Sequence, residues 1–160
     1  MHTISKNINF RTVEPISGES YKFLLSSVFN VLNFYQARDF DIEHIRGDHQ
    51  FDCLRESVRP ALLHITAAGE HVPEAERSIQ TVESDCRTTY NGLPYTYYPK
   101  IMLRSMVRFS VRNRNLFPSL NGVSQTMSPT SILTGLPSPD DSYFSLEFGA
   151  YVHTHDHPDT

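Results

Sequence analysis

The sequence predicts an α/β domain with a mixed sheet. Short β-like segments alternate with longer segments of helical period along its 160 residues, which is the order that this fold class requires. Hydrophobic residues make up 39% of the chain and aromatic residues 11%, enough to form a core and to exclude a wholly disordered protein. No apolar run reaches the roughly 20 residues of a membrane-spanning helix, and the two cysteines form no CxxC pair. We therefore expect a soluble intracellular domain with no membrane partner.

The amino-terminal segment predicts a pair of short strands followed by a helix. Residues 2–13 are β-like on both sides of a polar turn at Ser5-Lys6-Asn7. Ser17 or Gly18 can cap the helix that follows, and apolar or aromatic positions then repeat at the 3, 4 and 7 spacing of one buried face. These positions are Tyr21, Leu24, Leu25, Val28, Val31, Leu32 and Tyr35.

The middle of the chain predicts two further strands around a short helix. Alternation over residues 40–46 indicates a strand that Gly47 ends, which leaves Asp48 just past the carboxyl end of that strand. Residues 51–58 are expected to form a short helix, since Pro60 cannot continue one. The apolar run over residues 61–66 is expected to form the next strand.

Two long helices are expected next. The first begins at Pro73, which suits the first helical position, and ends at Asn91-Gly92. Its expected inward face consists of Ala75, Ile79, Val82 and Cys86. The second helix begins near Tyr98 or Pro99 and runs to Asn115. Its basic residues repeat every four positions and therefore lie along one side: Lys100, Arg104, Arg108 and Arg112.

The chain after residue 118 is rich in loops. We divide the protein there, into a core over residues 1–118 and a carboxyl-terminal extension over residues 119–160. Ser128-Pro129 is a cap followed by a first helical turn, which predicts a short helix to Thr134 that Gly135 closes. Residues 146–152 are expected to form a last strand.

The charges are segregated along the chain. The net charge is −4, which speaks against a generally basic nucleic-acid-binding protein. Residues 86–139, however, contain six basic residues and no acidic one, whereas residues 140–160 contain five acidic residues and no basic one. The basic side of the second long helix is therefore either an ordinary solvated surface or an attachment site for a polyanion.

Two acidic elements could share a divalent cation. Asp48 lies at a strand end, and Glu74 and Glu76 lie in the first turn of the helix that begins at Pro73. Carboxylate oxygens from separate elements suit Mg²⁺, although two-metal phosphoryl transfer ordinarily uses a third carboxylate. The two glutamates are about 200° apart around the helix, so only one of them can point inward. Capping and dipole roles explain the same residues equally well.

Two other candidate sites are weaker. The carboxyl-terminal HTHDHPD places His153, His155 and His157 on one side of an extended chain, which can bind a transition metal, but a terminal tail rarely provides a preorganised site. Neither Cys53 nor Cys86 lies in an evidently cationic setting, and the sequence contains no GxSxG or P-loop pattern. Nucleophilic catalysis is therefore not expected.

Several motifs occur in a recognisable order. Gly47-Asp48-His49-Gln50-Phe51 is followed by Ala75-Glu76-Arg77 with Thr81 in register, by Leu93-Pro94, and by the interval from Asn115 to Pro118. Ser128-Pro129 to Gly135 and Phe148-Gly149-Ala150-Tyr151-Val152 complete the series. Together these motifs resemble the integrase core of copia-type retrotransposons, and more closely the copia-like polyproteins of protist genomes.

The resemblance implies an RNase H-like fold and a DNA-joining reaction. Integrases of this family use two Mg²⁺ ions, or Mn²⁺, held by an Asp-Asp-Glu triad, and they act on DNA in the nucleus. Asp48 then corresponds to the second aspartate and Glu76 to the glutamate, as catalytic residues and metal ligands. The first aspartate has no counterpart, because Met1 lies in what would be the second strand of the family.

The absent element matters for folding as well as for chemistry. In the family, the first strand is central and pairs with the second strand on one side and the fourth on the other. Without it, two half-sheets keep unpaired edges, which is an aggregation liability. Self-association, or a strand donated by another segment of the polyprotein, would repair this in part.

Three functions stay open. The first is a truncated integrase core with two of three carboxylates, weak Mg²⁺ binding and no expected DNA joining. The second is a non-catalytic module that binds nucleic acid or protein through the helix over residues 99–115. The third is an active subunit that another polypeptide completes.

Overall fold

The computed structural model describes residues 1–18, 20–67, 72–138, 144 and 146–150. The elements in this part are β1 (His2–Ile4), β2 (Arg11–Val13), α1 (Tyr21–Gln36), β3 (His44–Gly47), the 3₁₀ helix η1 (His49–Leu54), β4 (Leu62–Ile65), α2 (Pro73–Gly92), α3 (Lys100–Leu116) and α4 (Pro129–Thr134). The predicted α/β class is confirmed. None of the described helices combines the length and the apolar character that crossing a membrane requires.

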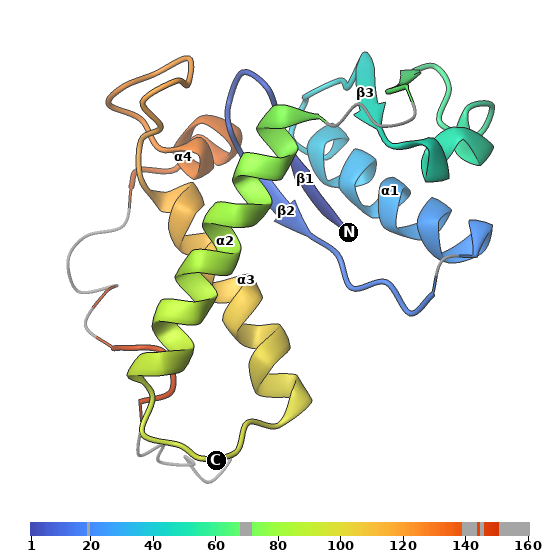
Figure 1. The fold of residues 1–160 in the computed structure, drawn as a ribbon. Helices are drawn as coiled ribbons and strands as arrows, with labels where there is room; N and C mark the ends of the chain where they lie inside the picture. The colour runs from blue at the N-terminus through green and yellow to red at the C-terminus, as the bar shows by residue number, and fades with distance from the viewer. Residues whose placement is uncertain (19, 68–71, 139–143, 145, 151–160) are drawn as a thin grey trace, which may run out of the picture.

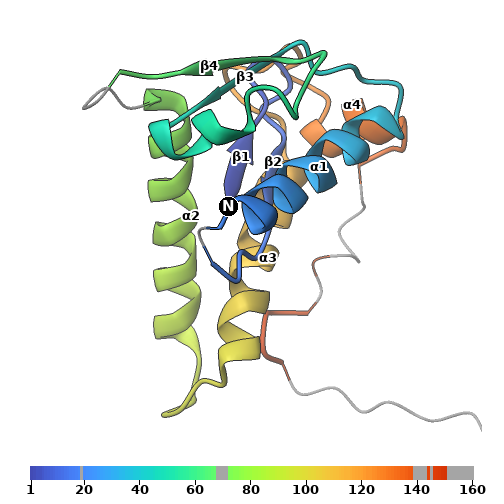
Figure 2. The same cartoon turned by 90° about the vertical axis from the view of Figure 1, so that its right-hand side faces the viewer.

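The described strands form two separate two-stranded sheets, so the predicted mixed sheet is divided into the two half-sheets that we expected in the absence of a central first strand. β1 and β2 pair antiparallel, and β3 and β4 pair parallel. The β1–β2 hairpin lies between the α2–α3 pair and α1, while β3 and β4 run across one end of the molecule (Figures 1 and 2). The sheets stay separate because no described strand lies between β1 and β3 to bond both.

Helix α1 joins the two parts of the core. Its buried residues Leu24 and Val28 pack with Leu54 of η1 and Leu63 of β4. A turn or two further along, α1 residues pack with other elements in a second cluster formed by Phe10, Val31, Tyr35 and Leu133. The predicted buried face of this helix is thus largely confirmed, although Tyr21 at its start is 46% exposed. The helix begins after Ser20 rather than after Ser17 or Gly18.

Helix α2 begins at Pro73 and ends at Gly92, as predicted, and its inward face agrees with the expected one in part. Val82 is buried and Ala75 and Cys86 are partly buried, whereas Ile79 is 40% exposed and Ser78 is buried in its place. The apolar pattern misled here because a serine occupies the most buried position of the helix. The hydroxyl of Ser78 is satisfied by polar partners on the β1–β2 hairpin, which makes this burial possible.

Three other elements show how well local signals predicted local structure. Ser128 caps α4 by accepting a hydrogen bond from the Ser131 amide, and Gly135 ends the helix with φ of +69°, as its position predicted. The short helix expected over residues 51–58 is instead the 3₁₀ helix η1, which ends at Leu54. The strand expected over residues 146–152 is wrong for residues 146–150, which form a bend and a turn, and residues 151–152 lie outside the described residues.

Candidate functional site

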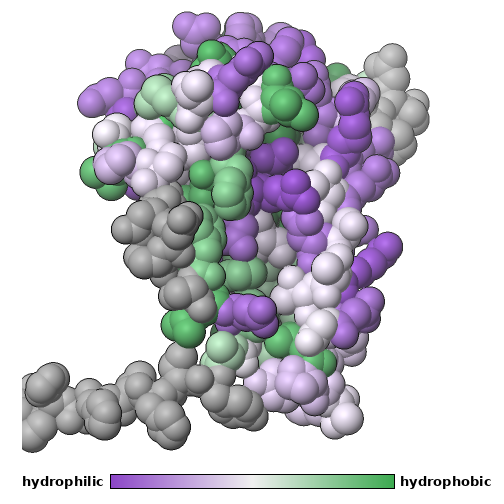
Figure 3. All heavy atoms as spheres, turned by 90° about the vertical axis from the view of Figure 1, so that its left-hand side faces the viewer, coloured by the Kyte–Doolittle hydropathy of each residue, from purple (hydrophilic) through white to green (hydrophobic). Residues whose placement is uncertain are grey.

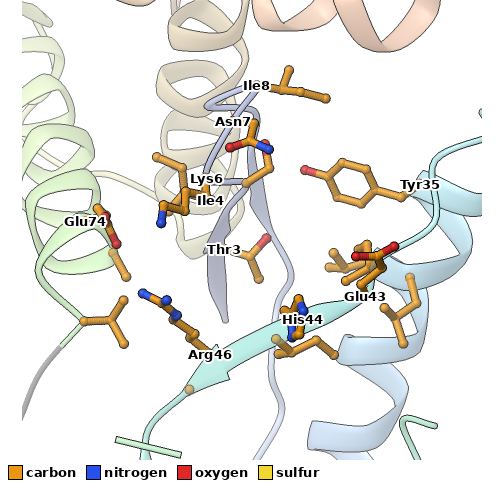
Figure 4. Close-up of a pocket in the computed structure, with 18 of the residues that line it drawn as sticks. Thr3, Ile4, Lys6, Asn7, Ile8, Tyr35, Glu43, His44, Arg46 and Glu74 are labelled. Atoms are coloured by element: carbon orange, nitrogen blue, oxygen red, sulfur yellow. The ribbon is translucent and has the colours of Figure 1, made fainter. Parts of the chain in front are cut away.

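A large hollow in the described structure lies between the two sheets. Its volume is about 1050 Å³, and β1 and β3 supply opposite parts of its wall (Figure 4). Helix α1 contributes Val28, Val31 and Leu32, and the first turn of α2 contributes Glu74. Most of the lining is apolar, which is typical of a ligand pocket, and the volume lies at the upper end of the usual range for such pockets.

The backbone groups that face this pocket follow from the two hydrogen-bond ladders. In the parallel pair, the carbonyls of Glu43 and Gly47 accept hydrogen bonds from the amides of Leu62 and Thr66, so the odd-numbered residues of β3 face β4. The N–H and C=O groups of His44 and Arg46 therefore point away from β4. In the antiparallel pair, Ser5 donates to the Phe10 carbonyl, so the odd-numbered residues of the first strand face β2.

The even-numbered residues of β1, His2 and Ile4, accordingly present their backbone groups on the edge away from β2. The facing edge of β3 presents those of His44 and Arg46. All four residues line the pocket. The pocket is thus bounded by two strand edges.

The outer edges of the same two sheets are closed by side chains. Asn115 of α3 accepts a hydrogen bond from the Arg11 amide at 2.8 Å and donates one to the Arg11 carbonyl at 2.7 Å, so it completes the outer edge of β2. Arg55 donates to the Leu63 carbonyl at 3.1 Å on the outer edge of β4. Among the described residues, the edges that face the pocket receive no comparable side chain. In the described part of the chain, side chains therefore satisfy backbone groups on the outer edges of β2 and β4 but none on the edges of β1 and β3 that face the pocket.

A buried tyrosine hydroxyl also lies at the pocket. Tyr35 is only 5% exposed, and its Oη has no hydrogen-bond partner of acceptable geometry among the described residues. Burial raises the pKa of this phenol, and the nearby Ser5 hydroxyl partly opposes the rise. The ring projects toward the pocket from α1 (Figure 4). An unsatisfied buried hydroxyl costs about 1–3 kcal/mol, so a bound acceptor or donor would stabilise this site.

A polar network holds the hairpin against α2. The Ser78 hydroxyl, 3% exposed, lies 2.8 Å from His2 Nε2 and accepts a hydrogen bond from Arg11 Nε at 2.9 Å. Burial and the charge of Arg11 lower the pKa of His2 to about 4, and burial also lowers the pKa of Arg11. Sequence reasoning missed this network, since its only signal was a serine at an inward helical position.

The predicted acidic residues lie near the pocket but do not line it. Asp48 follows β3 directly, as predicted, and is exposed in the turn that begins η1. Glu76 is exposed on α2. Gly47 and Glu74, their close neighbours in the sequence, are the residues that line the pocket. Glu74 thus lines the pocket, whereas Glu76, about 200° away around the helix, does not. The pairing of Asp48 with Glu76 stays a prediction.

The predicted site for Mg²⁺ or Mn²⁺ at Asp48 and Glu76 stays a prediction. In the part of the chain that the structure describes, no three His, Cys, Asp or Glu side chains gather closely enough to hold a metal ion. Glu74 lies at the same end of the pocket as two cationic side chains, Lys6 and Arg46 (Figure 4). The histidines of the tail, His153, His155 and His157, lie outside the described residues.

The four predicted basic residues lie on the exposed side of α3. Lys100, Arg104, Arg108 and Arg112 are all exposed. The described ion pairs give the first three no acidic partner, whereas Arg114 on the same helix forms a two-pronged pair with Asp85 of α2 at 2.5 and 2.6 Å. On the face drawn in Figure 3, most of the described surface is hydrophilic or neutral, and apolar side chains gather in a band down its middle.

Comparison with known protein families finds no matching family model, and comparison with curated proteins finds no match. The resemblance to copia-type integrases therefore depends on the sequence motifs alone.

Proposed function

We propose that this chain is a catalytically incomplete integrase core of the copia type, a retrotransposon remnant with an RNase H-like ancestry. One observation supports the proposal above others. In the family, the central first strand lies between the second and fourth strands, which correspond here to β1 and β3. The pocket bounded by strand edges lies between β1 and β3, where the resemblance places that first strand.

The proposed lack of activity follows from a missing carboxylate. Two-metal phosphoryl transfer needs carboxylates that clamp both ions against the reacting oxygens. Asp48 and Glu76 supply two carboxylates at most, and the family's first aspartate has no counterpart in this sequence. Losing one clamp removes several kcal/mol of transition-state stabilisation, so we expect Mg²⁺ to bind weakly and DNA ends not to be joined.

A strand-transfer assay tests this part of the proposal. The purified protein is incubated with labelled DNA ends and either Mg²⁺ or Mn²⁺, beside the Asp48→Asn and Glu76→Gln variants. We expect all three proteins to give the background level of joined product. Robust joining by the wild-type protein that Asp48→Asn abolishes would show a complete catalytic centre and would overturn the proposal.

A second candidate function, DNA binding without chemistry, is favoured by α3. Three exposed cations on this helix, Lys100, Arg104 and Arg108, lack acidic partners among the described ion pairs. Like charges at i, i+4 spacing destabilise a helix by a few tenths of a kcal/mol per pair. A phosphate backbone along the helix would remove that repulsion and release counterions.

Salt-dependent binding measurements test the second function. We expect the dissociation constant for a duplex to rise with salt concentration and the triple variant of Lys100, Arg104 and Arg108 to Ala to bind more weakly with a smaller salt slope. A control with the same change in charge replaces Lys22, Arg59 and Arg77, which are exposed on other elements. Equal losses in both variants would indicate an effect of net charge and would eliminate α3 as the binding surface.

A further inference from the structure

We propose that the pocket between β1 and β3 binds an extended segment of another polypeptide, which adds as a strand to the open edge of β3. This inference depends on the geometry of the pocket and not on DNA binding or integration. Its first support is the contrast between the sheet edges. Side chains of Asn115 and Arg55 close the outer edges, whereas His44 and Arg46 on the inner edge of β3 offer backbone donors and acceptors to the pocket.

The size of the pocket fits a strand. A strand occupies about 4.8 Å between neighbours, about 10 Å between packed layers and about 3.3 Å per residue along its length, or about 160 Å³ per residue. The volume of about 1050 Å³ therefore accommodates about six or seven residues of extended chain. A segment of that length is typical of a strand in a sheet.

The lining indicates the side chains that the segment would carry. Alternate residues of an added strand would face α1, where Val28, Val31 and Leu32 present an apolar surface. We therefore expect an alternating segment with β-branched apolar residues on one face. This is the recognition mode in which backbone bonds provide affinity and side-chain pockets provide specificity.

The charges at one end of the pocket add a further requirement. Lys6 and Arg46 lie at the same end as Glu74 (Figure 4), and no described ion pair involves Lys6 or Arg46. Two cations thus accompany one carboxylate there. We expect the bound segment to place one acidic residue at this end.

The orphaned hydroxyl of Tyr35 is an independent sign that the pocket receives a polar ligand. This side chain is 95% buried and lines the pocket, and its hydroxyl has no hydrogen-bond partner of acceptable geometry among the described residues, although the Ser5 hydroxyl lies nearby. A peptide backbone at the pocket would supply a carbonyl or an amide within its reach. Apolar ligands would leave the hydroxyl unsatisfied, so the phenol favours a polypeptide over a lipid or another purely apolar molecule.

Amide hydrogen exchange, followed residue by residue with NMR, tests the strand addition directly. The probe is a synthetic peptide, Asp-Val-Thr-Val-Thr-Val-Thr, with fluorescein at its amino terminus. In the free protein, we expect the amides of Ile45 and Gly47 to be protected by β4 and those of His44 and Arg46 to exchange quickly. Peptide binding should then slow exchange of the His44 and Arg46 amides and leave exchange of the Ile45 and Gly47 amides unchanged. The response should therefore alternate from one residue to the next along β3.

Modified peptides and protein variants make the test sharper. N-methylation of either the valine or the threonine amides removes the donors along one peptide edge only, and we expect the two modified peptides to differ in affinity. Arg46→Glu should weaken binding of the acidic peptide up to about fivefold and strengthen binding of a peptide with Lys in place of Asp, whereas Lys22→Glu should leave both unchanged. Tyr35→Phe should lower affinity severalfold without unfolding the protein.

Three results would overturn the proposal. Absence of binding by fluorescence anisotropy at millimolar concentrations, or equal binding by all N-methylated peptides, would exclude pairing by the backbone. Concentration-dependent dimerisation with protection of His44 and Arg46 in the absence of peptide would identify a second copy of this chain as the occupant instead. A negative DNA-binding result would leave the peptide result unaffected, so failure of the two proposals can be told apart.

Discussion

The pH dependence of folding should report the burial of His2. Burial, and to a smaller extent the charges of Arg11 and the amino terminus, lower the pKa of this histidine from 6.5 to about 4. Above pH 6.5 the side chain is neutral in both the folded and the unfolded protein. Between pH 6.5 and 4 the unfolded chain binds a proton that the folded protein does not bind. The free energy of unfolding therefore falls as the pH falls through this window and levels off below it.

The size of the effect follows from the shift. A difference of about 2.5 pKa units corresponds to about 3.4 kcal/mol for a fully shielded group, at about 1.36 kcal/mol per unit. Because His2 is only partly buried, solvent screening reduces its contribution, and we expect about 1–2 kcal/mol. That amount is a substantial fraction of the stability of a small domain.

Urea denaturation at closely spaced pH values from 4 to 7.5, together with a matched variant, measures this contribution. The difference in unfolding free energy between the wild-type protein and His2→Gln cancels the titration of other groups, and His49→Gln replaces an exposed histidine as the control. We expect the advantage of the wild-type protein over His2→Gln to shrink as the pH falls, with no such trend for the control. Parallel pH profiles for all three proteins, or a pKa near 6.5 in an NMR titration of His2, would refute the reasoning.

Three further changes probe the core by urea denaturation. Asn115→Ala leaves two backbone groups on the outer edge of β2 without partners, so it should lower the free energy of unfolding by about 2–4 kcal/mol, and an equal effect of the neighbouring Asn113→Ala would contradict this. Leu54→Ala, at a side chain 1% exposed, should cost about 2–5 kcal/mol, against less than about 1 kcal/mol for Leu62→Ala, whose side chain is 56% exposed. Tyr35→Phe removes an unsatisfied hydroxyl and should leave stability unchanged or raise it by about 1 kcal/mol, so a marked loss would reveal a hydrogen bond.

The sequence predicted only part of the candidate site. Glycine after an alternating segment placed Asp48 at the end of a strand, and helical geometry showed that Glu74 and Glu76 cannot share a direction. The motifs favoured Glu76, but the residue that lines the pocket is Glu74. Which side of a helix faces a pocket depends on the neighbours that pack against it, and these neighbours were not evident from the periodicity.

Buried polar residues were the least predictable part of the fold. Ser78 and Asn115 have no apolar signal, yet they are 3% and 4% exposed. Each is buried because a distant segment supplies partners: Ser78 contacts His2 and Arg11, and Asn115 bonds the backbone of Arg11. A sequence pattern cannot distinguish such a residue from an exposed one, because its burial is stable only with those partners in place.

By itself, the sequence determined the order of strands and helices, the start of α2 at Pro73 and the capping of α4 by Ser128 and Gly135, because each depends on neighbours within a few residues. Tertiary structure alone decided which strands pair and that a pocket opens between β1 and β3. Strand pairing joins segments that are far apart in the chain, and which strands pair depends on which strand edges the tertiary fold brings together. The local propensity of a segment to form a strand does not indicate its partner.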